Sequence, residues 1–206
     1  EDQMASIMDQ LEIMGVEVEE IEDGMPKPME ELTVPDFNSF VAFDIETTGF
    51  DSKSDGITEI AVCKVKNGEI IDEYTTFVNP EKPIPQRVQE LTHITEDMVK
   101  DAPTIDVAIK EFMEFAKDTI LVAHNANFDM GFMKQKSKEC GRSFDLPYLD
   151  TLVLARCMFR NLPNFRLDTI CNHLGVILAS HHRAVDDAGA TAEAFVKMLD
   201  KTCKLC

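Results

Sequence analysis

Asp44 and Glu46 are the first residues whose types and spacing suggest chemistry. They follow the apolar run 40–43, and in an extended strand the side chains of alternate residues project to the same side. Two neighbouring carboxylates repel each other unless a cation or a shared proton relieves them. The residues 47–49, Thr-Thr-Gly, then break the strand and let the backbone turn close to whatever binds there. We interpret this stretch as half of a metal site.

Two later acids are candidates for the other half of that site. Asp129 follows an expected strand and opens an expected helix, where an Asp also has a simpler explanation in the helix dipole. Asp187 lies beside the expected inward face of the last helix. An acid at such a position is costly unless it is paired or binds metal. We therefore expect four carboxylates, from four distant positions, to share one site.

His182 precedes Asp187 by five residues, just ahead of the last helix. Most single histidines are surface or structural residues. Two adjacent histidines followed by acids at a helix start favour chemistry, and an unperturbed pKa of about 6.5 suits a general base near neutral pH. His181 is the alternative, but the residue five positions after it is Asp186, which lies farther from the inward face.

The composition indicates one domain of ordinary size with an appendage. The chain has 206 residues, of which 44% are hydrophobic, and 13 are Phe. This is enough for a sizeable core. No apolar run reaches the length of a membrane span, and no signal-peptide pattern opens the chain, so we expect no membrane partner. The six scattered cysteines are typical of a cytosolic protein with reduced thiols.

The charge is strongly negative and unevenly distributed. The formal net charge is −18, which taken alone argues against nucleic acid as a partner. Residues 1–36 contribute −11 of it, and the remainder of the chain contributes −7. If four acids of that remainder bind two divalent cations, the working domain is only mildly acidic. An enzyme that grips one strand end through metal ions needs no broad basic patch.

The elements that must position these residues divide the chain into three parts. Residues 1–38 form an acidic segment with a short helix at 2–14, an edge-like strand and a linker, residues 39–201 form the working domain, and 202–206 are a tail. The expected strands are 40–46, 58–65, 69–78, 119–123 and 148–151, with a two-residue Asn-Gly turn joining the second and third. The expected helices are 86–91, one that Thr104 caps and that ends near 116, one ending near 140, one ending at 159, 168–174 and 183–199.

A hairpin sheet followed by alternating helices and strands predicts an α/β fold with a mixed sheet. The inward face of the last helix is expected to consist of five residues: Ala184, Ala188, Thr191, Phe195 and Met198.

In combination these motifs are specific. The order D-x-E, then H-N-x-x-F-D, then H-x-x-x-x-D resembles the DEDD 3′–5′ exonucleases, in the branch with a catalytic histidine, over about residues 39–200. The flanking sequence also matches that family, including Leu-Thr-His-Ile-Thr at 91–95 and Asp-Thr-Leu at 150–152. Within the family, the proofreading exonucleases of bacterial DNA polymerase III are the most similar, either as the separate epsilon subunit or as the domain built into PolC-type chains.

The resemblance implies a ribonuclease H-like fold, a mixed five-stranded sheet flanked by helices, with the acidic N-terminal appendage outside it. It implies two divalent cations, Mg²⁺ or Mn²⁺, with Asp44 bridging both, Glu46 and Asp187 on the ion that activates water, and Asp129 supporting the second. His182 would be the general base. The implied substrate contacts are Thr47, Thr48, Gly49, Thr92, His93, Asn125 and Phe128. One departure is His93, where the family usually has Gly.

The resemblance further implies release of 5′-mononucleotides from the single-stranded or frayed 3′ end of DNA, in the bacterial cytoplasm. The partner would be a polymerase III subunit or polymerase domains in the same chain. Three alternatives remain open: an exoribonuclease of the same family that trims RNA, a non-catalytic module that binds polymerase or nucleic acid, and a solvated acidic interaction protein. The last explains the first 36 residues but not acids at the ends of apolar strands.

Overall fold

The fold is described from a computed structural model that covers residues 37–178 and 183–203, with side chains to residue 201. The expected helix at 2–14 and the candidate base His182 therefore lie outside the described residues. The strands are β1 (Ser39–Thr47), β2 (Ile57–Lys66), β3 (Glu69–Phe77), β4 (Ile120–Ala123) and β5 (Tyr148–Asp150). The helices are α2 (Gln86–Thr92), α3 (Glu96–Val99), α4 (Ile105–Phe115), α5 (Ala126–Glu139), α6 (Thr151–Met158), α7 (Leu167–Leu174) and α8 (Ala184–Cys203).

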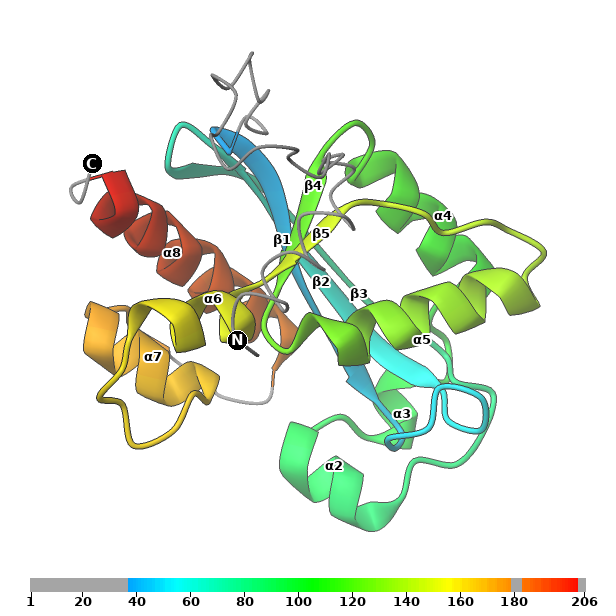
Figure 1. The fold of residues 1–206 in the computed structure, drawn as a ribbon. Helices are drawn as coiled ribbons and strands as arrows, with labels where there is room; N and C mark the ends of the chain where they lie inside the picture. Colours follow the sequence, from blue (N-terminus) through cyan, green and yellow to red (C-terminus); the bar gives the residue numbers. More distant parts are fainter. Residues whose placement is uncertain (1–36, 179–182, 204–206) are drawn as a thin grey trace, which may run out of the picture. The chain divides into compact units, whose positions relative to one another are not determined.

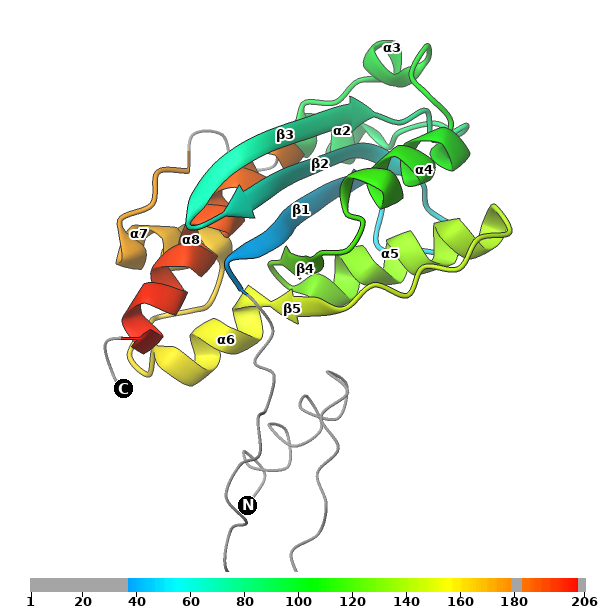
Figure 2. The ribbon, with the colours of Figure 1, turned by 90° about the horizontal axis from the view of Figure 1, so that it is seen from above.

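The five strands form one mixed sheet in the order β3-β2-β1-β4-β5. The pairs β1–β2 and β2–β3 are antiparallel, whereas β1–β4 and β4–β5 are parallel. Helices α4 and α5 cover one face of the sheet, and α8 covers the other with α6 and α7 beside it (Figures 1 and 2). This arrangement confirms the predicted five-stranded α/β fold.

The two faces of β1 explain why its acids meet α8. Phe43 and Ile45 are buried on the side of α4 and α5, where the Phe43 ring lies 5.3 Å from that of Phe112. Phe40 and Ala42 are buried in the cluster that includes α8. Because side chains alternate along a strand, residues 44 and 46 continue the α8 face. That face therefore changes from apolar to acidic along the strand.

Small residues let α8 lie close to the sheet. Ala184, Ala188 and Ala192 have no exposed surface, and the Phe195 ring packs edge-on against Phe40 at 4.9 Å. The five residues predicted for the inward face are all buried, so that prediction is confirmed. Asp187 lies on α8 next to this face and is itself only 5% exposed.

Local signals in the sequence placed most turns and helix ends correctly. Asn67 and Gly68 both have a positive φ, as the predicted two-residue hairpin turn requires. Thr104 does occupy the position before α4, but its side chain makes no capping hydrogen bond, so the predicted side-chain cap is wrong. The four-residue α3 was not predicted, since one helical turn is too short to show a periodic pattern.

The four cysteines whose side chains are described, Cys63, Cys140, Cys157 and Cys171, are free thiols. In the part of the chain that the structure describes, no helix combines the length and the apolar character that crossing a membrane requires.

Candidate active site

Three carboxylates meet where the α8 face of β1 reaches the start of α8. One oxygen each from Asp44, Glu46 and Asp187 lies within 4.8 Å of the others. In the antiparallel pair of β1 and β2, Asp44 lies opposite Ala61 and Glu46 lies opposite Glu59. A β-bulge follows Glu46. Residues 141 positions apart in the sequence thus form one acidic cluster, which contains three of the four acids predicted to share a site.

Asp129 lies beside this trio. Asn125 adopts a left-handed conformation (φ 62°) at the start of α5, which turns the chain sharply out of β4 and sets the helix beneath the end of β1. Asn tolerates this conformation better than most residues. Asp129 is only 3% exposed, and its charge is one of those that raise the pKa of Asp44.

Burial and mutual repulsion raise the pKa values of these carboxyl groups. Burial is the largest cause that raises the pKa of Asp44 well above its usual value, followed by the charges of Asp129, Asp187 and Glu46. Burial, then Asp187, raises the pKa of Glu46 to about 8. Burial also raises the pKa of Asp129, while its backbone hydrogen bonds oppose the shift. Near neutral pH such a cluster must hold protons or a cation.

The cluster fits a divalent cation. Its donors are all carboxylate oxygens, which is the set that hard cations prefer, and three of them are close enough to share one ion. A bound cation would relieve the repulsion that, together with burial, raises the pKa values of Asp44 and Glu46. The residues present therefore match the metal site expected from the sequence.

Metal-free protein is expected to lose stability as pH rises. Glu46 titrates near 4.5 when unfolded and near 8 when folded, so the folded state favours its protonated form. The stability that this proton contributes is complete below about pH 4.5 and disappears as pH rises through about 8. We expect metal-free protein to lose at least about 2 kcal/mol between pH 5 and 8.5, and we expect Mg²⁺ or Mn²⁺ to raise the melting temperature more at pH 8 than at pH 5.

Differential scanning fluorimetry across pH, with and without the metal, measures both effects. Glu46→Gln should reduce the pH dependence because it removes one of the titrating groups. A melting temperature of the metal-free wild type that rises steadily from pH 5 to 8.5 would contradict the electrostatic description.

A partly buried ion pair fixes the start of α8. The Glu59 carboxylate, 2% exposed, accepts hydrogen bonds from Arg183 Nη2 at 2.9 Å and Nε at 3.3 Å, and from the backbone amide of Ala184 at 3.2 Å. The Arg183 guanidinium also lies over the Phe77 ring. This bridge between β2 and α8 sets where Asp187 falls relative to β1. Sequence reasoning did not single out Glu59, because an acid in the middle of an apolar strand has no local signal for its partner.

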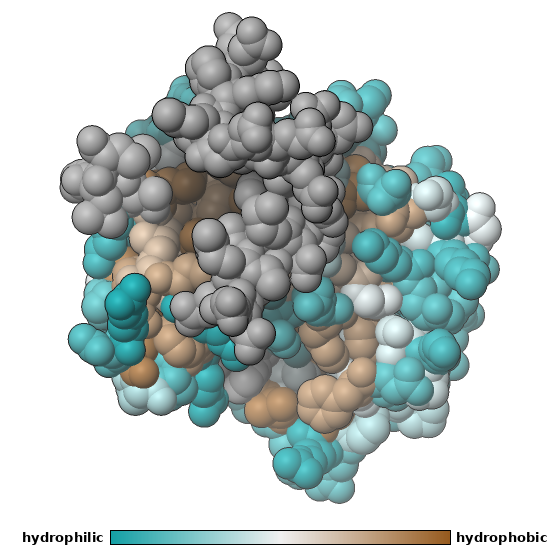
Figure 3. Space-filling model, viewed as in Figure 1, coloured by the Kyte–Doolittle hydropathy of each residue, from teal (hydrophilic) through white to brown (hydrophobic). Residues whose placement is uncertain are grey.

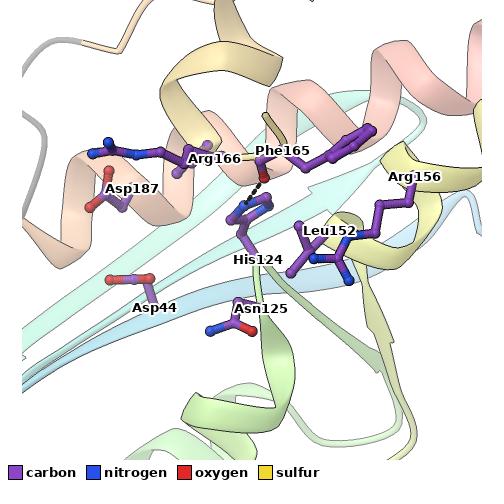
Figure 4. A pocket seen from close by; sticks show the side chains of 9 residues that line it. Asp44, His124, Asn125, Leu152, Arg156, Phe165, Arg166 and Asp187 are labelled. Carbon is purple, nitrogen blue, oxygen red and sulfur yellow. Dashed lines mark hydrogen bonds between the residues drawn. The ribbon is translucent and has the colours of Figure 1, made fainter. Parts of the chain in front are cut away.

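A cavity of about 490 Å³ opens beside the carboxylates (Figure 4). It is lined by Asp44, His124, Asn125, Leu152, Arg156, Phe165, Arg166, Leu167 and Asp187. Of the predicted site residues, Asp44, Asn125 and Asp187 line it. The residues from α6 and from the segment leading into α7 were not predicted as site residues, although Leu152 lies in the Asp-Thr-Leu motif that matched the family.

His124 holds one wall of this cavity in place. Its Nε2 lies 3.1 Å from the carbonyl oxygen of Phe165, as the dashed line in Figure 4 marks, and its Nδ1 lies 2.9 Å from the Thr151 hydroxyl. A carbonyl can only accept, so Nε2 carries a proton and donates it to the Phe165 carbonyl. His124 thereby ties the end of β4 to the segment before α7, and we assign it a positioning role.

The predicted contacts at 47–49 form a tight loop at the end of β1. The Thr47 hydroxyl donates to the Gly49 carbonyl at 2.6 Å, and the Thr48 hydroxyl accepts from the Gly56 amide at 3.0 Å. A Cβ on Gly49 would collide with the Asp55 carboxylate. The two hydroxyls thus shape the loop, and Gly at position 49 keeps its backbone accessible.

The remaining predicted contacts lie in two places. The buried Thr92 hydroxyl donates to the Val88 carbonyl and accepts from the Ile94 amide. His93 ends α2 with a φ of 58°, which explains why Gly is usual there: only Gly adopts this conformation at no steric cost. Phe128 is half-buried on α5, and its ring lies 6.3 Å from that of the exposed Phe50.

Comparisons with known proteins agree with this geometry. A family model, RNase_T, described as an exonuclease, matches residues 41–195. The chain is 48% identical over 189 residues to the DNA polymerase III PolC-type of Caldanaerobacter subterraneus subsp. tengcongensis, covering 92% of this chain and 14% of that protein. It is 42% identical over 197 residues to the same polymerase of Bacillus subtilis, covering 91% and 13%. The chain thus spans about a seventh of these relatives.

Solved structures with the same fold are also exonucleases. Exonuclease X, solved in complex with 5′ overhanging duplex DNA, matches with a TM-score of 0.66 and 26% identity over 80% of this chain and 93% of that one. Exonuclease I matches with a TM-score of 0.71 over 80% of this chain and 41% of that one, and at 17% identity this likeness concerns the fold alone.

Proposed function

The chain belongs to the exonuclease family, and on that premise we propose that it removes 5′-mononucleotides from the 3′ end of single-stranded or frayed DNA in a reaction that needs divalent cations. The observation that carries the proposal is the trio of Asp44, Glu46 and Asp187, whose oxygens lie within 4.8 Å of one another at the edge of a cavity large enough for a nucleotide. Similarity to Exonuclease X, solved with DNA, supports a DNA end as the substrate.

Each predicted acid receives a role in this proposal. Asp44, Glu46 and Asp187 hold Mg²⁺ or Mn²⁺, and Asp129 supports a second ion from its place beside them. When bound, two such ions stabilise the attacking and leaving oxygens of a phosphoryl displacement. Thr47, Thr48 and Gly49 present their loop to the terminal nucleotide, with Thr92, His93 and Phe128 as further contacts. Asp129 and Asp187 are buried and Asp44 and Glu46 are partly buried, which keeps the acids positioned before substrate arrives.

The test is an end-labelled cleavage assay. A 5′-labelled DNA oligomer with Mg²⁺ should shorten one nucleotide at a time, with 5′-mononucleotides as the other product, and EDTA should stop the reaction. An RNA oligomer of matched sequence tests the alternative of an exoribonuclease. If the RNA is cleaved faster than the DNA, RNA is the substrate. Cleavage within the strand, or the same rate in EDTA, would overturn the proposal.

His182 is proposed as the general base that takes a proton from the attacking water. His182→Ala should lower kcat by about 10²-fold or more, the range typical of general bases, while Mn²⁺ affinity measured by calorimetry stays within about threefold. An equal loss of metal affinity would instead make His182 a ligand. His181→Ala is the matched control, and its kcat should stay near that of the wild type.

We further propose that this activity serves proofreading by DNA polymerase III, because the matching relatives are PolC-type polymerases in which this region is a small part of the whole. The polymerase would be attached in the same chain or bound as a partner. Comparing excision of a mismatched and a matched 3′ end, with the polymerase present, tests this assignment. Equal excision rates would count against it.

A further inference from the structure

The far side of the cavity contains a cation that the proposed chemistry does not use. The Arg156 side chain comes from α6 and approaches the cavity from the side opposite Asp44 and Asp187 (Figure 4). Its guanidinium lies over the Phe165 ring, 6.0 Å from the centroid. Within the described residues it forms no ion pair with a carboxylate. Arg166 differs, since it lies 3.8 Å from Asp168 and extends toward the side of Asp187.

Arg142, Arg166 and Arg183 form ion pairs with carboxylates, whereas Arg156 stacks on an aromatic ring at the wall of the cavity. An exposed guanidinium that stacks on an aromatic ring and presents its N–H groups to a cavity is well suited to a phosphate, which it can bind through two parallel hydrogen bonds.

The rest of the wall suits the sugar and base that accompany a phosphate. Leu152, Phe165 and Leu167 supply apolar surface, and Figure 3 shows apolar surface interrupted by hydrophilic side chains over α6 and α7. An aromatic ring can stack on any base, so such a wall tolerates every sequence. The positioning bonds of His124 hold the Phe165 backbone at the cavity.

We propose that Arg156, packed on Phe165, binds a phosphodiester of the substrate strand on the 5′ side of the bond that is cut. The inference rests on the proposed function, which puts the terminal nucleotide at the loop 47–49. That loop does not line this cavity, so the cavity receives the strand that leads away from the carboxylates. Arg156 is then a binding residue for the incoming strand and a source of preference for polymers over single nucleotides.

The experiment compares two substrates in Mg²⁺. One is a single-stranded DNA decamer, and the other is the p-nitrophenyl ester of thymidine 5′-monophosphate, which contains the scissile phosphate but no strand beyond it. Arg156→Gln should raise KM for the decamer about tenfold, so the ratio of kcat/KM for decamer over ester should fall at least fivefold. The dependence of decamer KM on salt should also weaken, by about 0.7 in the log–log slope for one lost phosphate contact.

Two control variants accompany this comparison. Lys110→Gln removes one positive charge from an exposed position on α4, on the opposite face of the sheet, and should leave the substrate ratio and the slope unchanged. Arg156→Lys keeps the charge without the planar fork and should fall between wild type and Arg156→Gln.

An unchanged decamer KM and salt slope in Arg156→Gln would overturn the inference. So would an equal loss on both substrates, because Arg156 would then act on the chemistry or on the fold. A wild-type protein that cleaves neither substrate would overturn the proposed function instead, so the two failures are distinguishable.

Discussion

Asp44→Ala is expected to lower exonuclease turnover at least about 10³-fold, since it removes the carboxylate at the centre of the acidic cluster. Burial is the largest cause that raises the pKa of Asp44, and the charges of Asp129, Asp187 and Glu46 each raise it further, so each of the other acids acts close to it. Steady-state cleavage of a labelled DNA oligomer measures the loss.

The same substitution should leave the fold intact. Removing one of several repelling acids is expected to raise the melting temperature of metal-free protein and to reduce the stabilisation by Mg²⁺ or Mn²⁺. Asp186→Ala is the matched control, because Asp186 is the neighbouring acid on α8 and lies outside the cluster. Full activity of Asp44→Ala in the presence of metal would falsify the assignment of the site.

Arg183→Ala is expected to have the largest effect on stability, a loss of about 3 kcal/mol or more. Among the described residues, the substitution leaves the Glu59 carboxylate, 2% exposed, with the Ala184 amide as its hydrogen-bond donor. A buried charge that loses its partner costs far more than an exposed ion pair contributes. Because the ion pair fixes the start of α8, the displacement of Asp187 should also lower kcat.

Denaturant unfolding measures the change as a lower midpoint. The double variant Glu59→Gln with Arg183→Ala should recover most of the stability, because no unpaired charge remains in the core. Arg183→Lys should be intermediate, since Lys keeps the charge but cannot donate two parallel hydrogen bonds. If Arg183→Ala unfolds at the wild-type midpoint, the ion pair does not anchor the helix.

The effect of the ion pair on the site connects the two predictions. Glu59 is also close enough to raise the pKa values of Asp44 and Glu46, while the Arg183 charge lowers that of Glu46. The pair therefore sets both the position of Asp187 and the field in which the acids ionise. Loss of Arg183 is expected to shift the pH profile of turnover to higher pH, because the pKa of Glu46 would rise further.

The secondary structure was predictable because its signals are local. Alternation along β1, the Asn-Gly turn at 67–68 and the apolar periodicity of α8 each lie within one element, and all three predictions are confirmed. The exceptions were also local in origin. The single turn of α3 has no period to detect, and the Thr104 hydroxyl makes no capping bond although its residue type favours one.

The candidate site was predictable in its residue types but not in its full composition. The acids Asp44, Glu46 and Asp187 were found because an acid at the edge of an apolar face is costly without a partner. Arg156 and Glu59 were missed, since an exposed arginine on a short helix and an acid in a strand are common and show nothing of their partners. His124 stands inside a matched motif but was not singled out.

By itself, the sequence determined which faces of β1 and α8 are apolar and that acids interrupt both. Repeats of two and 3.6 residues describe one element at a time, so they show which side of an element is buried but not what lies against it. Only the tertiary structure brought Asp44, Glu46 and Asp187 within 4.8 Å, set Asp129 beside them and paired Arg183 with Glu59. Those contacts join β1 and β2 to residues more than 80 positions later in the chain, and they depend on how the alanine face of α8 packs on the sheet.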